Sequence, residues 1–194
     1  MGKTVRPKYQ GTEQILFTSD THAYHKSILK FCPKSRFGAD HEEMTELMIK
    51  KWNETVGPDD VVYHLGDVSF GGSEATAKYL KRLNGIIHLV LGNHDSEDQM
   101  RKMNRFESIH NYLEIIVQGV PWILFHYPIF EWNMMHHGSV HLYGHVHGRK
   151  MEMPEGRCMD VGMDTRTDMG LYTIREIKSL VLNKPVRDHH DKRG

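Results

Sequence analysis

The sequence lacks the features that mark several large classes of protein. Its 194 residues include only two cysteines, Cys32 and Cys158, without a CxxC spacing. Neither a disulfide framework nor a zinc-finger pattern is therefore expected. No apolar run is long enough to span a bilayer, and the basic start is not followed by the apolar stretch of a signal peptide. We therefore expect a cytoplasmic protein that does not associate with a membrane.

An excess of charge of either sign is also missing. Lysine plus arginine and aspartate plus glutamate number 25 each, so the chain has no electrostatic footprint for tight, sequence-independent binding of nucleic acid. Nucleic acid remains a candidate partner only as a substrate met at an active site. The composition, 39% hydrophobic and 26% charged, is that of an ordinary globular protein, and it carries no information on the oligomeric state.

The length fits a single domain over residues 1–194, with flexible ends at 1–12 and 183–194. In the first half, strand-like apolar runs alternate with helical patterns, which predicts βαβ units and a largely parallel sheet. The strands are expected at 15–18, 61–65 and 86–91, and the helices from Asp40 to Val56 and from a Ser73 cap to Leu83. The second half predicts a hairpin of 112–117 and 121–125, short strands at 140–143, 157–161 and 171–174, and a last helix at 175–182.

Histidine, in contrast, is abundant, with 15 copies, and several stand beside acids or glycines just after a strand-like run. Five such blocks follow one another: Asp20-Thr21-His22, Gly66-Asp67, Gly92-Asn93-His94-Asp95, His126, and Gly144-His145-Val146-His147-Gly148. A sheet that delivers imidazole and carboxylate groups to one edge can build a dinuclear metal site with positions open to water and substrate. We therefore expect a metal-dependent hydrolase.

The residue types suit such a site. Asp67 follows a buried strand and a glycine, and its carboxylate can bridge two ions. Asn93 offers a neutral oxygen, which limits negative charge where a phosphate must bind. His145 and His147 can face neighbouring ions if the backbone turns sharply, and the flanking glycines permit that turn.

The ordered set resembles the calcineurin-like metallophosphoesterase family, and the residues from Phe17 to His25 are similar to those of its small bacterial and phage members. The resemblance implies an α/β fold, a four-layer α/β/β/α sandwich with two mixed sheets. It also implies two divalent ions, the first held by Asp20, His22, Asp67 and His147, the second by Asp67, Asn93, His126 and His145. Mixed nitrogen and oxygen ligands suit Mn²⁺, our first choice, or Fe, Ni²⁺, Co²⁺ or Zn²⁺.

The resemblance further implies hydrolysis of a phosphoester, with in-line attack on phosphorus by a hydroxide that bridges the two ions. In this scheme His94 is not a metal ligand. Together with Asn93 it contacts the phosphate, and it protonates the leaving oxygen as a general acid. His25, just behind the first block, is a candidate for a further phosphate contact, and a plain surface histidine is the alternative.

The second block departs from the pattern G-D-x-V-D-R-G of the protein phosphatases in this superfamily. The Asp that orients the catalytic histidine falls on Phe70, and the Arg that clamps the phosphate falls on Gly71. This departure argues against a protein phosphatase of that type. Together with the absence of an evident cap domain, it favours small phosphodiesters such as 2′,3′-cyclic nucleotides. Phosphomonoesterase and nuclease activities at the same site are the alternatives.

Other classes fit less well. The pair His94-Asp95 follows a strand-like run, whereas the pairs of HD-type phosphohydrolases lie on helices. The motif H-x-H-x-D-H of metallo-β-lactamases fails after His147. A non-catalytic, metal-stabilised scaffold is a further alternative, and the presence of His94 favours the enzyme. Within a strand, His64 is expected to be a packed core histidine, and the role of Asp160 and Asp164 as partners of the ligands stays open.

Overall fold

The computed structural model describes residues 8–9, 14–153 and 156–187. Ten strands are present in this part of the chain: β1 Lys8–Tyr9, β2 Ile15–Thr18, β3 Val61–His64, β4 Ile86–Val90, β5 Ser108–His110, β6 Leu113–Val117, β7 Val120–Leu124, β8 Val140–Tyr143, β9 Cys158–Asp160 and β10 Tyr172–Thr173. The helices are α1 Ile28–Phe31, α2 His41–Thr55, α3 Ser73–Lys81, α4 Glu97–Lys102 and α5 Ile174–Val181.

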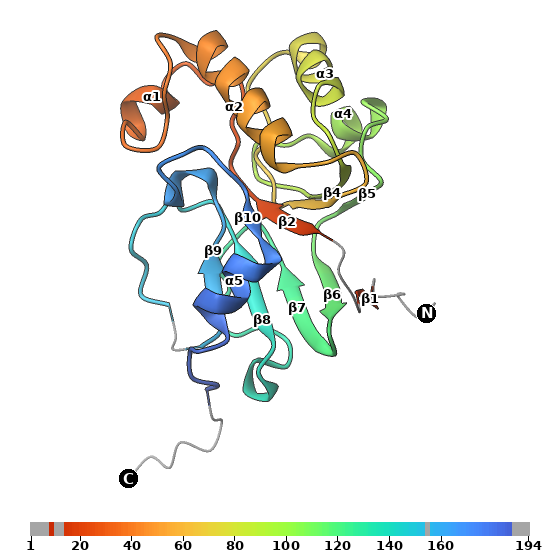
Figure 1. Ribbon diagram of the computed structural model, residues 1–194, viewed down its shortest axis with the longest axis vertical. Helices are drawn as coiled ribbons and strands as arrows, with labels where there is room; N and C mark the ends of the chain where they lie inside the picture. The colour runs from red at the N-terminus through yellow and green to blue at the C-terminus, as the bar shows by residue number, and fades with distance from the viewer. Residues whose placement is uncertain (1–7, 10–13, 154–155, 188–194) are drawn as a thin grey trace.

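Two five-stranded sheets form the centre of the molecule (Figure 1). The first has the order β10-β2-β3-β4-β5, and the second has the order β1-β6-β7-β8-β9. Each sheet contains parallel and antiparallel pairs, so the predicted α/β class with two mixed sheets is confirmed. In the first sheet β2, β3, β4 and β5 are parallel, as the alternation of strands and helices predicts.

Helix α2 shows how the sequence specifies one covering element of the first sheet. The Asp40 carboxylate accepts the backbone N–H groups of Glu42 and Glu43 at 2.9 Å, which satisfies donors that a helix start leaves unpaired. Met44 and Trp52 lie on the buried face, and the Trp52 indole N–H donates to the Asn84 carbonyl at 3.0 Å. The helix thereby joins the apolar core on the outer face of the first sheet.

A second core lies between the two sheets. The Phe17 ring of the first sheet stacks on Tyr63 and, across the interface, on Trp122, with 5.6 Å between ring centroids in both pairs. Helix α5 packs against β10, β2 and β9 and contributes Ile177 and Val181 to this core. The outer face of the second sheet is covered by the segment that holds the buried Trp132.

Several local features differ from the sequence expectations. Ser73 does not cap α3; it is the first helical residue, and Gly72 occupies the cap position without a side-chain hydrogen bond. Patterning predicts none of the short elements α1, α4, β1 and β5. The expected flexible ends, 1–12 and 183–194, fall mostly outside the described residues, but Lys8–Tyr9 pairs in parallel with β6, and the Lys184 ammonium donates to the Cys158 carbonyl at 2.6 Å. No helix in the described ranges has the length and apolar character needed to cross a membrane.

The fold brings the ends of strands from both sheets to one place. Backbone pairing continues past the strands of the first sheet, since Asp20 N–H donates to Gly66 O at 2.9 Å and His22 N–H donates to Asp67 O at 3.0 Å. In the second sheet, Gly144 N–H donates to His126 O at 2.9 Å. The two sheets are tied together there by a parallel bridge between Ser19 and Gly162.

Candidate metal centre

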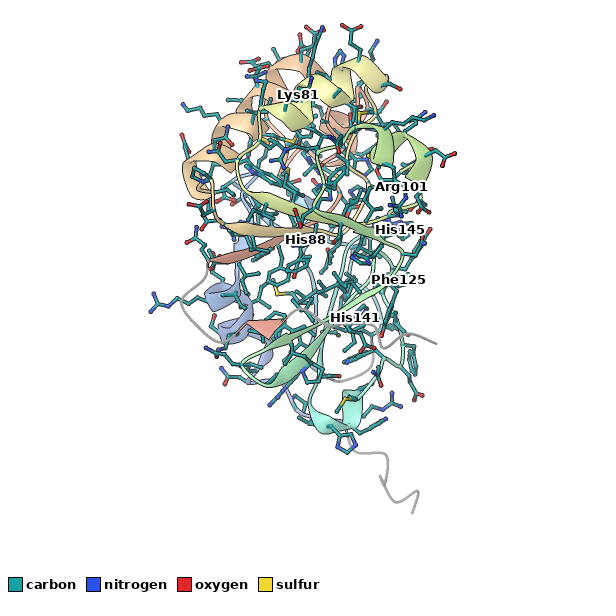
Figure 2. All side chains as sticks on the ribbon, turned by 90° about the vertical axis from the view of Figure 1, so that its right-hand side faces the viewer. Lys81, His88, Arg101, Phe125, His141 and His145 are labelled. Carbon is teal, nitrogen blue, oxygen red and sulfur yellow. The ribbon has the colours of Figure 1, made fainter. Side chains whose placement is uncertain are left out.

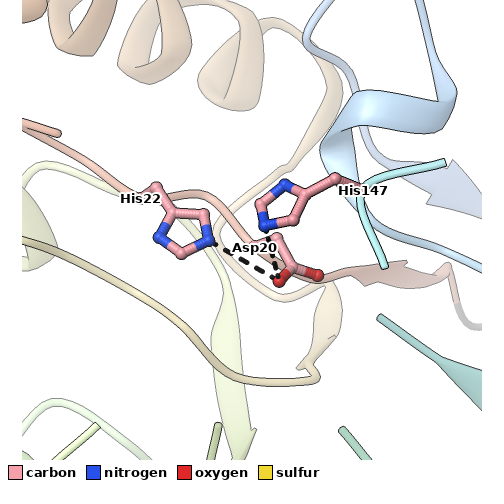
Figure 3. Close-up of side chains that lie close together, drawn as sticks. All are labelled: Asp20, His22 and His147. Atoms are coloured by element: carbon pink, nitrogen blue, oxygen red, sulfur yellow. Dashed lines mark ion pairs between the residues drawn. The ribbon is translucent and has the colours of Figure 1, made fainter. Parts of the chain in front are cut away.

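The structure gathers all five predicted blocks at these strand ends. Asp20 and His22 follow β2, Asp67 follows β3, Asn93 and His94 follow β4, His126 follows β7, and His145 and His147 follow β8. The rings of His22 and His147 stack with centroids 4.9 Å apart, and both rings face the Asp20 carboxylate (Figure 3). Every residue predicted as a metal ligand is therefore in this region.

The backbone at these residues is unusual. Asp20, His22, Asp67, His145 and His147 have positive φ angles of 55°, 47°, 58°, 70° and 51°. Such left-handed conformations cost a residue with a side chain about 1–2 kcal/mol and persist only where the surroundings impose them, which is typical of functional sites. Five of the seven predicted ligands share this strain. These backbone conformations lower the stability of the fold and direct the side chains of the ligands.

One group of donors comprises Asp20, His22 and His147. The Nε2 atoms of His22 and His147 lie 3.6 and 3.9 Å from Asp20 Oδ1, which is too long for hydrogen bonds. Asp20 Oδ1 and both ring nitrogens of His22 are buried without a hydrogen-bond partner. Ligand atoms bound to one ion at about 2.0–2.2 Å lie roughly 3–4 Å apart, so this group fits a metal ion.

A second group comprises Asp20, Asp67 and His126. Asp67 Oδ2 lies 3.7 Å from His22 Nε2 on one side and 3.6 Å from His126 Nε2 on the other. Its second oxygen, Oδ1, accepts the backbone N–H of His94 at 2.9 Å. Asp67 thus stands between a histidine of the first group and a histidine of the second, with one oxygen directed at both.

Asn93 connects the remaining histidines to the second group. Its Oδ1 lies 3.0 Å from His126 Nε2 and 2.9 Å from His145 Nδ1. On the other side of its ring, His126 Nδ1 lies 2.7 Å from the Leu65 carbonyl, to which it donates. In the tautomer with its single proton on Nδ1, His126 presents a lone pair at Nε2, and this lone pair faces the Asn93 oxygen. Two acceptors in contact are an arrangement that a shared cation would satisfy.

The electrostatics keep Asp20 ionised inside the protein. Burial alone would raise the pKa of its carboxyl group, but the neighbouring imidazoles of His22, His126 and His147 lower that pKa to about 2. Its second oxygen, Oδ2, accepts the backbone N–H of His145 at 2.8 Å. The side chain of Asp20 is therefore a fixed anion near neutral pH.

Two glycines allow the strand ends to approach this closely. A Cβ atom at Gly92 would lie 2.3 Å from Asp67 Oδ1, and one at Gly144 would lie 2.1 Å from Ser19 Oγ and 2.3 Å from Asp20 Oδ2. Any larger residue at these positions would displace the acids. The glycines of the predicted blocks are therefore part of the site.

Two further residues, Arg36 and Asp164, support the centre from behind. Asp164 Oδ2 lies 2.7 Å from His147 Nδ1, and the Arg36 guanidinium donates to both Asp164 oxygens, at 2.7 and 2.9 Å. Arg36 also donates to the backbone carbonyl groups of Asp20 and Thr21. Burial acts to raise the pKa of Asp164, but Arg36 and His147 hold it well below its usual range. With Nδ1–H donating to a carboxylate, His147 keeps Nε2 free to bind a metal.

The sequence leaves the orientation of His94 open, with the adjacent Asp95 as a candidate partner. Asp95 instead accepts the backbone N–H groups of Asp67, Val68 and Gly92 at 2.8–3.0 Å. It therefore fixes the loops that carry the ligands and leaves His94 without a carboxylate. Among the described residues, the His94 ring has ring contacts but no hydrogen-bond partner.

Phe70 takes the place beside His94 that an acid holds in the protein phosphatases. Its ring centroid lies 4.7 Å from that of His94 and 4.2 Å from that of His25, and it is 5.1 Å from the His22 ring. His25 therefore lies at the rim of the centre. Burial, followed by the charge of His22, lowers the pKa of His25 below its usual value.

The expectation for His64 is confirmed. His64 is buried and accepts Gly66 N–H at Nδ1 (3.1 Å), while its Nε2 lies 2.9 Å from the Thr21 hydroxyl. Burial lowers the pKa of His64 to about 3, so the ring is neutral and belongs to the core. In the loop after His126, Trp132 is also a core residue, since it is 6% exposed.

Fold and site together define a metal-dependent phosphoesterase: strand ends of two mixed sheets present acids and histidines in groups that fit metal ions. The profile of the calcineurin-like phosphoesterase superfamily domain matches residues 14–159, and the chain belongs to this superfamily. The family resemblance drawn from the five blocks is thereby confirmed.

The chain also has relatives of similar length. An uncharacterized protein of Methanocaldococcus jannaschii is 30% identical over 185 residues, which cover 92% of this chain and 97% of the relative. The gene 66 protein of Mycobacterium phage D29 is 29% identical, covering 86% of this chain and 95% of that protein. Among solved structures, a protein of unknown function from Aquifex aeolicus superimposes with a TM-score of 0.69 at 25% identity, covering 88% of this chain and all of that one.

Proposed function

We propose that the chain hydrolyses small phosphodiesters, such as 2′,3′-cyclic nucleotides, at a centre of two divalent transition-metal ions, with Mn²⁺ as the first choice. The observation that carries this proposal is the position of Asp67, whose Oδ2 lies 3.7 Å from His22 and 3.6 Å from His126. A carboxylate between two sets of donors is suited to serve both ions. Asn93 and His145 complete the second set, and Asp20, His22 and His147 complete the first.

Bound divalent ions would supply positive charge for the phosphoryl oxygens and a water of lowered pKa. The protein contributes position, because the strained backbone and the glycine contacts direct the ligands before substrate arrives. His94 is exposed at the rim and packs against Phe70. From there its ring can hold the proton that the leaving oxygen requires. His25 lies on the other side of Phe70 and is our candidate for a further phosphate contact.

Two positions favour diesters over monoesters. A terminal phosphate carries a second negative charge that an arginine clamp would neutralise, but that position is Gly71, where a Cβ atom would lie only 2.8 Å from the Tyr24 ring. The position of the second acid is Phe70, which is 41% exposed and brings an apolar surface to the rim. A phosphodiester has a single charge and a second organic group, and both suit this environment.

Hydrolysis assays test the proposal directly. We expect the protein loaded with Mn²⁺ to cleave bis-p-nitrophenyl phosphate and 2′,3′-cyclic AMP with a higher kcat/KM than p-nitrophenyl phosphate. A higher kcat/KM for the monoester would make the protein a phosphomonoesterase. If none of the three substrates is hydrolysed with Mn²⁺, Fe²⁺, Ni²⁺, Co²⁺ or Zn²⁺, the proposal that the protein is an enzyme is refuted. A metal-stabilised scaffold would then be favoured.

A further inference from the structure

A cavity of about 520 Å³ opens next to the metal centre on the side of the second sheet. Its walls include His145, which belongs to the centre through Asn93. They also include Tyr127, which follows His126, and Arg149 to Met151, which follow the last block. The cavity therefore begins where the predicted ligands end. A molecule whose phosphate lies on the donor groups can extend into this cavity.

The cavity is basic, although the chain as a whole has no net charge. Arg149 and Lys150 line it, and no carboxylate is among its lining residues. Arg149 is held in place because its Nε–H donates to the Val146 carbonyl at 3.2 Å, which leaves the terminal nitrogens available. Within the described ranges neither cation forms an ion pair, whereas other arginines, such as Arg82 and Arg166, are paired with acids. Two unpaired cations beside a centre for phosphate are suited to a second anionic group.

The cavity is also lined by an aromatic residue, Tyr127. The Tyr127 ring packs against the rings of His126 and His145, with centroids 5.0 and 4.6 Å away, and against Phe125 at 5.6 Å. These contacts fix one side of the ring, while 38% of the residue stays exposed. A fixed, partly exposed aromatic ring is a surface on which a nucleobase can stack.

We propose that this cavity is a nucleotide subsite, in which Arg149 and Lys150 bind a second phosphate of the substrate and Tyr127 contacts its base or sugar. The inference rests on the proposed function and specifies the substrate class, namely a nucleotide diester that carries a further phosphate, such as a 5′-phosphorylated 2′,3′-cyclic nucleotide. A substrate without a second phosphate would offer no anionic group to Arg149 and Lys150.

The test compares 2′,3′-cyclic AMP with and without a 5′-phosphate on the Mn²⁺-loaded protein. We expect the 5′-phosphate to lower KM roughly tenfold, the gain typical of one charge-assisted contact. The double variant Arg149→Ala/Lys150→Ala should lose this ratio and keep its kcat/KM for bis-p-nitrophenyl phosphate. Lys81→Ala is the matched control, because Figure 2 shows Lys81 on the helical layer, away from His145, and it should keep the ratio. Equal KM values for the two nucleotides in the unmodified protein would overturn the inference.

Direct binding separates this inference from the proposed function. If no ester is hydrolysed with any metal, the proposed function fails. Calorimetry with 3′-AMP and adenosine 3′,5′-bisphosphate then still tests whether the subsite binds a second phosphate. We expect the bisphosphate to bind roughly tenfold more tightly than 3′-AMP to the unmodified protein and to Lys81→Ala. The double variant should bind both nucleotides equally. Equal affinities in the unmodified protein would refute the subsite.

Discussion

Replacement of Asp164 by Asn tests whether a residue outside the metal centre controls it. The Asp164 carboxylate accepts Ser35 Oγ and Arg36 Nε at Oδ1, and Arg36 Nη2 and His147 Nδ1 at Oδ2. An amide can accept on only one side. If its NH₂ group faces His147, the ring must accept at Nδ1 and carry its proton on Nε2, the atom that faces Asp20. If the NH₂ group faces the other way, it meets the N–H of Arg36.

The expected magnitude follows from these contacts. Loss of the outer partner of a metal-bound histidine lowers metal affinity about 10- to 100-fold, which is about 1.4–2.7 kcal/mol. Only one of the two proposed ions should be affected, because His147 stands with Asp20 and His22 and is not in the group of Asp20, Asp67 and His126. The buried Arg36 also loses its counter-charge, which costs at most about 3–5 kcal/mol. Within the usual range of about 5–15 kcal/mol, a domain whose free energy of unfolding is well above 5 kcal/mol remains folded after this loss.

The assay is a competition titration of Mn²⁺ or Zn²⁺ against a chromophoric chelator, with thermal unfolding measured in parallel. We expect one binding step to weaken and the other to remain. Asp168→Asn is the control, since Asp168 is also paired with an arginine, Arg166, at 2.9 Å, but is far less buried. Unchanged affinity for both ions in folded Asp164→Asn protein would refute the reasoning.

Three further predictions concern the centre and the core. Asp67→Asn should reduce the metal content from two ions to nearly none, as measured by mass spectrometry, and an unchanged content would contradict the bridging position. His94→Ala should keep the metals and lower turnover of diesters with poor leaving groups about 100-fold, with a smaller loss for p-nitrophenyl esters; equal losses would contradict its role as proton donor. Burial lowers the pKa of His64 from 6.5 to about 3, so between these values the unfolded chain binds a proton that the folded protein does not. The free energy of unfolding of the metal-free protein should therefore fall, through this group, by about 1.4 kcal/mol per unit as the pH decreases in this window. Urea unfolding at pH 7 and pH 5 should show a smaller fall for His64→Gln, and identical falls would contradict the assignment.

The sequence predicts those features of the structure that follow from the order of strand-like runs and the residues directly after them. Strand-like runs that end in acids or histidines predict both the parallel strands and the place where their side chains meet, since parallel strands present the same ends to one edge. Asp20 and Asp67 are together for this reason, whereas His126 follows β7 of the second sheet and is brought beside them by the packing of the two sheets. The hairpin of β6 and β7 was equally predictable, because Gln118 and Gly119 stand between two apolar runs. In the structure these two residues form the turn, with φ angles of 48° and 82°.

Features set by tertiary contacts could not be predicted in this way. Arg36 lies in an irregular segment and finds Asp164 across 128 positions of sequence, so no spacing connects the two. Ser73 is a favourable cap by residue type, yet Gly72 takes that position in α3. The short helices α1 and α4 contain too few residues for an apolar period to emerge.

The contact between Arg36 and Asp164 also limits how far the expressed chain can be shortened at its C-terminal end. The superfamily profile ends at residue 159, before Asp164, β10 and α5. A gene fragment trimmed to 14–159 would express a chain in which His147 loses its carboxylate, Arg36 is left with a buried charge, and β2 becomes an edge strand. The segment after residue 159 is therefore part of the minimal functional unit, and expression boundaries are best placed beyond Val181, the end of α5.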